Sequence, residues 1–213
     1  QPDWTVFGEG LDRLAKAGST VNLATLVGHG TVRSAVLGYQ DKGPSQEDLE
    51  AITRLVADSL DAGALGFSAG LYFPPGSYAR TEELIELARE AAKRGKLHSI
   101  HIRDEFDYSV GLFCAFQEAV EIGRISGVRV EVSHVKCAGP VVWGMATRVL
   151  ETMERARKEG VDVAGDQYPY TASYTPLAST VFPRAIQVGG REYIGGLGRP
   201  RSKAARPTIH RTE

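Results

Sequence analysis

The sequence lacks most features of a secreted or membrane-spanning protein. Its 213 residues include two cysteines, Cys114 and Cys137, which is too few for a disulfide framework. No apolar run approaches the roughly 18–20 residues that a membrane span needs. The first ten residues, QPDWTVFGEG, lack the basic and then apolar pattern of a signal peptide. These absences predict a cytoplasmic protein that has no membrane partner.

An excess of charge of one sign is also missing. The formal net charge is −1, whereas a nucleic-acid-binding surface needs many unpaired basic residues. Nucleic acid is therefore not an expected partner. The end of the chain differs, because residues 195–213 carry five basic residues and one acid, with few large apolar side chains. This segment is predicted to be a disordered basic tail, and residues 1–194 are predicted to form one structural unit.

Apolar runs and amphipathic segments alternate along the rest of the chain. Strands are predicted at residues 21–29, 64–71, 97–103, 128–136 and 161–169. Helical spacing of apolar residues predicts helices at about 7–14, 45–63, 81–95, 109–127 and 144–160. Ser45 and Asp48 resemble a capping box, and Thr81 and Ser109 are expected to begin their helices. This alternation indicates an α/β fold with a parallel sheet.

Two architectures fit a parallel sheet of this kind. One is an open doubly wound sheet, and the other is a (β/α)8 barrel. No G-x-G-x-x-G follows any predicted strand, which disfavours the dinucleotide-binding version of the first. A barrel has eight strands and typically about 250 residues. Five strands in this chain therefore predict a partial barrel.

The stretch LHSIHIRDE, residues 97–105, contains two histidines. Side chains alternate between the two faces of a strand. His98 shares a face with Ile100 and Ile102, which should pack against the helices. His101 then points into the barrel near the carboxyl end of its strand, where (β/α)8 enzymes carry their catalytic groups.

The next strand, VRVEVSHVK, places His134 and Lys136 on one face by the same alternation. If that face is the inner one, His101 and His134 lie on neighbouring strands and can share a metal ion, because the strands are about 4.8 Å apart. The alternative is that each is a hydrogen-bonded core histidine. His29, at the end of the first predicted strand, is expected to be structural.

Several segments together resemble the N-acyl-D-amino-acid deacylases (D-aminoacylases) of the amidohydrolase superfamily. They are NLATLVGHGTVR, GALGFSAGLYFPPGSYA, HIRDE, VSHVKCAG, WG and DQYPYTASYTPLAS, and the likeness runs from about residue 4 to 193. It implies a metal-dependent (β/α)8 hydrolase that cleaves N-acyl-D-amino acids, with one or two zinc ions. In that family the histidines of H-x-R and S-H-x-K are metal ligands, which implies this role for His101 and His134. The resemblance also implies that Lys136 and Tyr168 bind the substrate carboxylate.

Other features of that family are absent from this sequence. The chain has no H-x-H pair, and neither cysteine matches the family's metal-bridging cysteine. The aspartate that serves as general base belongs to the eighth strand and is expected outside this chain. The sequence is therefore interpreted as strands three to seven of the barrel, inactive on its own.

Two alternatives remain open. One is a non-catalytic remnant or binding module that keeps the pocket. The other is a cyclic amidase such as a dihydroorotase or hydantoinase. These enzymes typically use a carboxylated lysine on a strand, and residues 64–71 contain no lysine.

Overall fold

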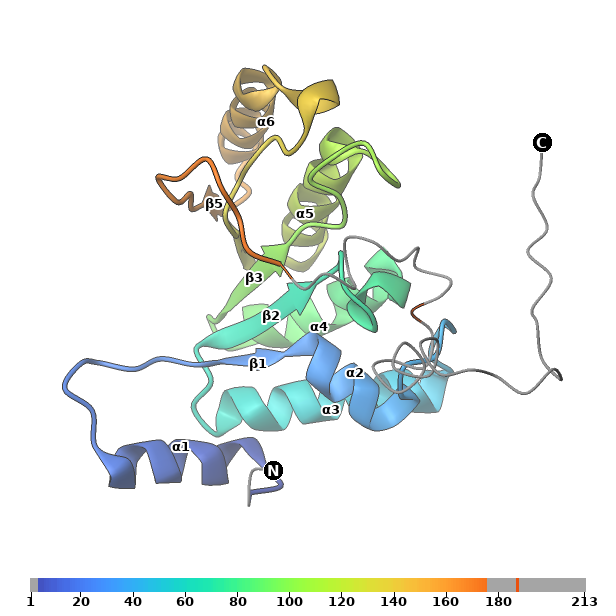
Figure 1. Ribbon diagram of the computed structural model, residues 1–213. Coiled ribbons are helices and arrows are strands. Elements are labelled where there is room, and N and C mark those ends of the chain that lie inside the picture. Colours follow the sequence, from blue (N-terminus) through green and yellow to red (C-terminus); the bar gives the residue numbers. More distant parts are fainter. Residues whose placement is uncertain (1–3, 176–186, 188–213) are drawn as a thin grey trace, which may run out of the picture.

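A five-stranded parallel sheet forms the centre of the computed structural model, which describes residues 4–175 and Gln187 (Figure 1). The strands lie side by side in chain order: β1 (Leu26–Gly28), β2 (Gly66–Gly70), β3 (Leu97–His101), β4 (Arg129–Val132) and β5 (Val163–Gly165). A doubly wound sheet reverses its strand order at a switch point, and this order never reverses. The predicted partial (β/α)8 barrel is therefore confirmed.

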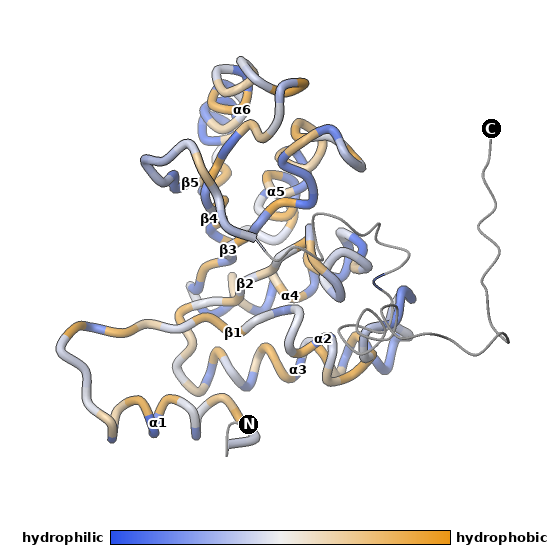
Figure 2. Tube along the Cα trace, in the orientation of Figure 1, coloured by the Kyte–Doolittle hydropathy of each residue, from blue (hydrophilic) through white to orange (hydrophobic). Residues whose placement is uncertain are grey.

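Helices follow the strands and cover one face of the sheet. They are α2 (His29–Leu37), α3 (Gln46–Asp61), α4 (Thr81–Lys93), α5 (Leu112–Ser126) and α6 (Ala146–Lys158). Each of these helices packs on the next, as expected when right-handed crossovers connect neighbouring parallel strands. Apolar and polar residues alternate along them (Figure 2), which gives each helix one buried side. A further helix, α1 (Phe7–Ala17), lies beside α3 (Figure 1).

The main core lies between the sheet and these helices. One layer of side chains crosses all five strands in register, and its members are between 0% and 4% exposed: Val27, Phe67, His98, Val130 and Val163. The opposite face of the sheet is more polar and only partly buried, with Ser68, Ser99 and Glu131 in register. The two faces therefore differ as the helix-facing and inner faces of a barrel do.

Some predicted element boundaries were wrong. The first strand covers three residues instead of nine, and His29 begins a helix that the sequence did not predict. Thr81 is not the N-cap of α4, because Arg80 holds that position and the Thr81 hydroxyl donates to Glu118 instead. The capping box of Ser45 and Asp48 is confirmed.

Ser109 does not begin α5 either. Its backbone N–H and its hydroxyl both donate to the carboxylate of Asp104, and the helix begins at Leu112. Two short 3-10 helices, η1 (Gly76–Tyr78) and η2 (Pro140–Val142), lie in the loops after β2 and β4.

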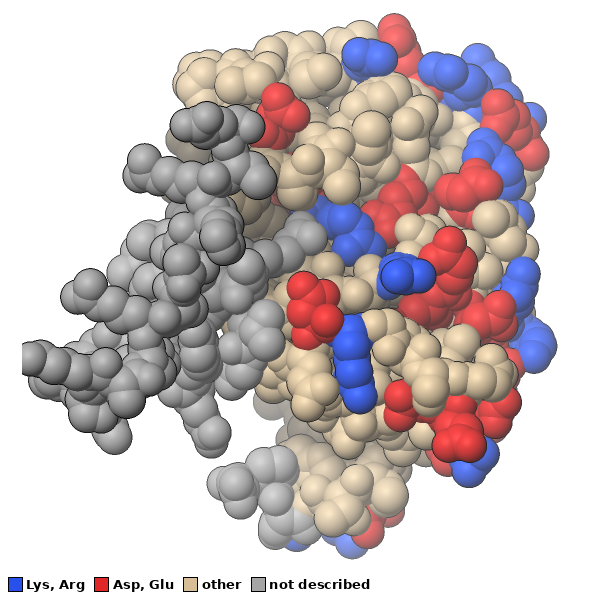
Figure 3. All heavy atoms as spheres, turned by 90° about the vertical axis from the view of Figure 1, so that its right-hand side faces the viewer, with Lys and Arg blue, Asp and Glu red and all other residues tan. Residues whose placement is uncertain are grey.

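Acidic and basic side chains are interspersed on the face shown in Figure 3. Many form pairs along or between helices, such as Arg94 with Asp61 and Arg124 with Glu159. Within residues 4–175, no helix is both long enough and apolar enough to cross a bilayer. The predicted disordered tail, residues 195–213, lies outside the described residues.

Candidate metal and substrate site

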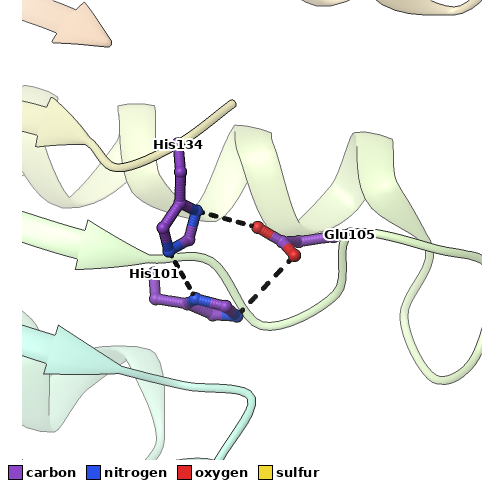
Figure 4. Close-up of side chains that lie close together, drawn as sticks. All are labelled: His101, Glu105 and His134. Carbon is purple, nitrogen blue, oxygen red and sulfur yellow. Dashed lines mark hydrogen bonds and ion pairs between the residues drawn. The ribbon is translucent and has the colours of Figure 1, made fainter. Parts of the chain in front are cut away.

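Three ionisable side chains meet at the carboxyl ends of β3 and β4 (Figure 4). His101 is the last residue of β3, His134 follows the end of β4, and Glu105 lies in the loop after β3. His101 Nδ1 is 2.9 Å from His134 Nε2, and His134 Nδ1 is 3.1 Å from Glu105 Oε1. His101 Nε2 lies 4.0 Å from Glu105 Oε2. The cluster is compact enough to hold one metal ion.

Strand alternation positions His101 as predicted. Ser99 and His101 point to the inner face, where the rings of Tyr72 and Phe73 pack around His101 at centroid distances of 5.9 and 5.0 Å. Burial is the main cause that lowers the pKa of His101 to about 4. The nearby Glu105 carboxylate partly opposes this shift, and His134 and Lys136 lower the pKa further. The imidazole is therefore neutral at neutral pH, which is the form that binds a metal ion.

His134 reaches the site for a reason that strand alternation did not predict. Val130 and Val132 point toward the helices, so a continued strand would have placed His134 on that side as well. The strand ends at Val132, and His134 adopts a φ of 43°, in the left-handed region that few non-glycine residues occupy. Its backbone N–H donates to the carboxylate of Asp166. This turn directs the ring of His134 toward His101.

Glu105 was not predicted as a site residue. It is 7% exposed and contacts Lys136 Nζ as well as His134. Burial alone would raise the pKa of Glu105, but His134, His101 and Lys136 together outweigh burial and lower the pKa. The carboxylate is therefore charged. The available signal was its position four residues after His101, directly past the end of a strand.

The loop that carries Glu105 is held by its neighbour Asp104. The Asp104 side chain is fully buried, and its carboxylate accepts hydrogen bonds from the backbone N–H groups of Phe106, Tyr108, Ser109 and Gly111. Burial opposes ionisation, but the hydrogen bonds from the backbone of Ser109, Phe106 and Gly111 and from the Ser109 hydroxyl together lower the pKa of Asp104. A charged carboxylate thus fixes the backbone next to Glu105.

Both residues predicted to bind substrate lie in the same cavity. It has a volume of about 410 Å³, and its lining includes His101, Glu105, His134, Lys136 and Tyr168. Lys136 Nζ is 2.9 Å from His134 Nδ1 and 5.6 Å from the centre of the Tyr168 ring. The structure therefore brings together all four residues that the sequence singled out.

The other two described histidines lie in the core. His98 is fully buried and stacks on Phe67 with ring centroids 4.1 Å apart. Burial lowers the pKa of His98 to about 3. His29 is also fully buried, and its Nε2 lies 2.7 Å from Glu83 Oε1. Neither belongs to the cluster at the ends of β3 and β4.

The imidazole pair fits two positions of a zinc site. Bonds of 2.0–2.1 Å in a tetrahedral arrangement hold two nitrogens about 3.3 Å apart, close to the 2.9 Å between His101 Nδ1 and His134 Nε2. Catalytic zinc sites use three protein ligands. Within the part of the chain that the structure describes, His101, Glu105 and His134 form the single group of three or more His, Cys, Asp or Glu side chains close enough to hold a metal ion.

No protein-family model matches the chain. It is 45% identical over 157 residues to an N-acyl-D-glutamate deacylase of Alcaligenes xylosoxydans xylosoxydans, which is 74% of this chain and 32% of that protein. It is 36% identical to a D-aminoacylase of the same organism over 171 residues, which is 80% of this chain and 34% of that protein.

Among solved structures, the chain resembles an N-acyl-D-glutamate deacylase of Bordetella bronchiseptica, with a TM-score of 0.76 and 39% identity over 80% of this chain and 35% of that one. That crystal structure contains zinc and a phosphonate inhibitor that mimics the tetrahedral intermediate of the reaction. The chain spans about a third of the length of the curated relatives that it matches.

Proposed function

We propose that this chain, a homologue of the N-acyl-D-amino-acid deacylases of the amidohydrolase superfamily, carries part of the active site of a zinc-dependent hydrolase. The substrate class is N-acyl-D-amino acids, and the bond cleaved is the amide. The observation that carries the proposal is the pair of imidazole nitrogens, 2.9 Å apart, at the same ends of two adjacent parallel strands. The zinc in the related Bordetella structure supports the choice of metal.

The residues of this chain have distinct roles in the proposal. His101 and His134 supply neutral nitrogens to zinc, which when bound polarises the substrate carbonyl and makes a water molecule more acidic. Lys136 binds the substrate carboxylate by a charge-assisted hydrogen bond, and Tyr168 lines the same cavity. Holding the carboxylate beside the metal orients the amide for attack. The general base, an aspartate, is proposed to lie outside the described residues.

Two alternatives predict different behaviour. A binding module would keep the cavity and bind an N-acyl amino acid without cleaving it. A cyclic amidase would need a carboxylated lysine, and β2 contains none. The cytoplasmic location remains a prediction from the sequence.

The test uses a chimera in which this chain replaces the matching third of the Alcaligenes N-acyl-D-glutamate deacylase. The chimera is expected to bind zinc and to hydrolyse N-acetyl-D-glutamate, and His101→Ala or His134→Ala should abolish both. His98→Phe is the matched control, because it changes a neutral core histidine on the same strand. Activity that survives both alanine substitutions would contradict the proposal.

The chain alone is expected to be inactive and to bind zinc weakly. The proposed ligands among the described residues are two imidazoles, whereas a catalytic zinc site uses three protein ligands, and the general base is proposed to lie outside these residues. Elemental analysis and a hydrolysis assay on the 213-residue chain measure this. Stoichiometric tight zinc together with turnover would show that the chain contains a complete site.

A further inference from the structure

Glu105 lies nearest to the ring nitrogen of each histidine that does not face the other histidine. His134 directs Nε2 toward His101 and Nδ1 toward Glu105, with distances of 2.9 and 3.1 Å (Figure 4). His101 directs Nδ1 toward His134, and its Nε2 lies on the side of Glu105 at 4.0 Å. An ion shared by the facing nitrogens would therefore use one nitrogen of each ring, and Glu105 is nearest to the other nitrogen of each ring.

The position of Lys136 determines which group can accept a hydrogen bond from His134. Its Nζ is 2.9 Å from His134 Nδ1 and also contacts Glu105 Oε1. A neutral imidazole carries one proton and one lone pair on its two nitrogens. If the lone pair is on Nε2, which faces His101, then Nδ1 carries the proton and needs an acceptor. An ammonium group can only donate, so the acceptor must be the Glu105 carboxylate.

We propose that Glu105 is a positioning residue that fixes the tautomer of His134, because it competes with Lys136 for the Nδ1 atom and is the hydrogen-bond acceptor of the two. The carboxylate accepts a hydrogen bond from Nδ1–H, and the lone pair of Nε2 stays directed at the metal position. Without Glu105, Lys136 donates to Nδ1 and the proton moves to Nε2, where it blocks metal binding. Carboxylates that hold metal-bound histidines in this way are common in metal sites.

The surroundings of Glu105 suit this role. The side chain is 10% exposed, so little water is available to replace it as an acceptor. The hydrogen bonds that the loop makes to Asp104 hold the adjacent backbone. The inference rests on the proposed function for one point, that His101 and His134 bind zinc. The competing assignment is that Glu105 is itself a zinc ligand.

The test is NMR spectroscopy of the 213-residue chain labelled with ¹⁵N in its histidine rings. Spectra without zinc report the tautomer of His134, and a zinc titration followed on the His101 and His134 rings reports affinity even if binding is weak. The variants are Glu105→Ala, Glu105→Gln, Lys136→Met and the double variant Glu105→Ala/Lys136→Met. Glutamine keeps an oxygen acceptor for Nδ1, and methionine keeps the length of lysine without a donor.

Glu105→Ala is expected to move the proton to Nε2 and to weaken zinc binding about 10–100-fold. Glu105→Gln should keep the Nδ1 proton and most of the affinity. Lys136→Met should have little effect alone, and the double variant should recover most of the affinity that Glu105→Ala loses. A general loss of structure would not be reversed by removing Lys136.

Two results would overturn the inference. If the double variant and Glu105→Gln bind zinc as weakly as Glu105→Ala, then Glu105 is a ligand and not a positioning residue. If His134 of the unsubstituted chain carries its proton on Nε2, the tautomer assignment is wrong. In a third outcome, the ring signals of His101 and His134 stay unchanged on adding zinc while His134 carries its proton on Nδ1. That result would contradict the proposed function and would leave the Glu105–His134 assignment standing.

Discussion

Glu83→Ala should strongly destabilise the fold, because Glu83 is the counter-charge of a buried arginine. Glu83 is 3% exposed, and its carboxylate lies 3.1 Å from Arg33 Nε and 2.7 Å from His29 Nε2. Both partners are fully buried. After the substitution, Arg33 keeps its hydrogen bond from Nη2 to the carbonyl of Lys42, at 2.7 Å, but no carboxylate.

Removing one partner of a buried ion pair typically lowers the free energy of unfolding by about 3–5 kcal/mol. Since about 1.4 kcal/mol is a factor of ten, the folding equilibrium should fall by two to four orders of magnitude. Urea unfolding followed by circular dichroism measures this from the transition midpoint. Glu82→Ala is the control, because Glu82 is the exposed neighbour on the same turn of α4.

A second variant separates the lost charge from the lost packing. Replacing both partners, as Arg33→Met/Glu83→Leu, removes the unpaired charge and should cost less than Glu83→Ala alone. If Glu83→Ala and Glu82→Ala lower the free energy of unfolding equally, the reasoning about an uncompensated Arg33 is refuted.

Three further predictions concern the site and its supports. Lys136→Ala in the chimera should raise KM for N-acetyl-D-glutamate by the equivalent of about 1.5–3 kcal/mol and hardly affect the matching α-carboxamide; equal effects on both substrates would mean that Lys136 does not bind the carboxylate. His98 has a pKa of about 3 in the folded chain, well below the value of about 6.5 in the unfolded chain. As the pH falls below about 6.5, the unfolded chain therefore binds a proton at His98 that the folded chain does not bind. The free energy of unfolding should then fall by up to about 1.4 kcal/mol per pH unit. His98→Phe should remove that slope between pH 6.5 and 4 in urea unfolding, and an unchanged slope would count against it. Asp104→Asn should destabilise the chain at pH 7 but not at low pH. The pKa of Asp104 is lowered in the folded chain, so the stability contributed by its charged form is present above about pH 4 and is lost as the pH falls through the folded pKa. A difference in stability that does not depend on pH would show that the charge of Asp104 is not the cause.

Much of the fold could be predicted because its helices and strands follow from local sequence patterns. Apolar runs marked the strands, and helical spacing with a capping box marked α3. Helix α2 was missed because what fixes it is distant in the sequence. His29 and Arg33 bind Glu83, which lies 54 and 50 residues away, and no local pattern reports such a contact.

The site could be predicted in part for the same reason. Alternation along β3 correctly placed His101 and His98 on opposite faces. For His134 the alternation argument was wrong, since a backbone turn with a positive φ directs the ring. Glu105 was missed because its role depends on a loop folded around Asp104. Resemblance to a known family, and not spacing, implied that Lys136 and Tyr168 bind substrate.

The strict chain order of the strands has a consequence for folding kinetics. Phe67 pairs with His98, His98 with Val130 and Val130 with Val163, so strands β2 to β5 meet their partners about 30–35 residues along the chain, and β1 meets β2 about 40 residues along, at Val27 and Phe67. Closing short loops costs less entropy than closing long ones, and folds with near neighbours in contact form faster. Each strand–helix–strand unit can therefore assemble as soon as its second strand is synthesised. The two histidines proposed to bind zinc come together within one such unit, since His101 and His134 are 33 residues apart.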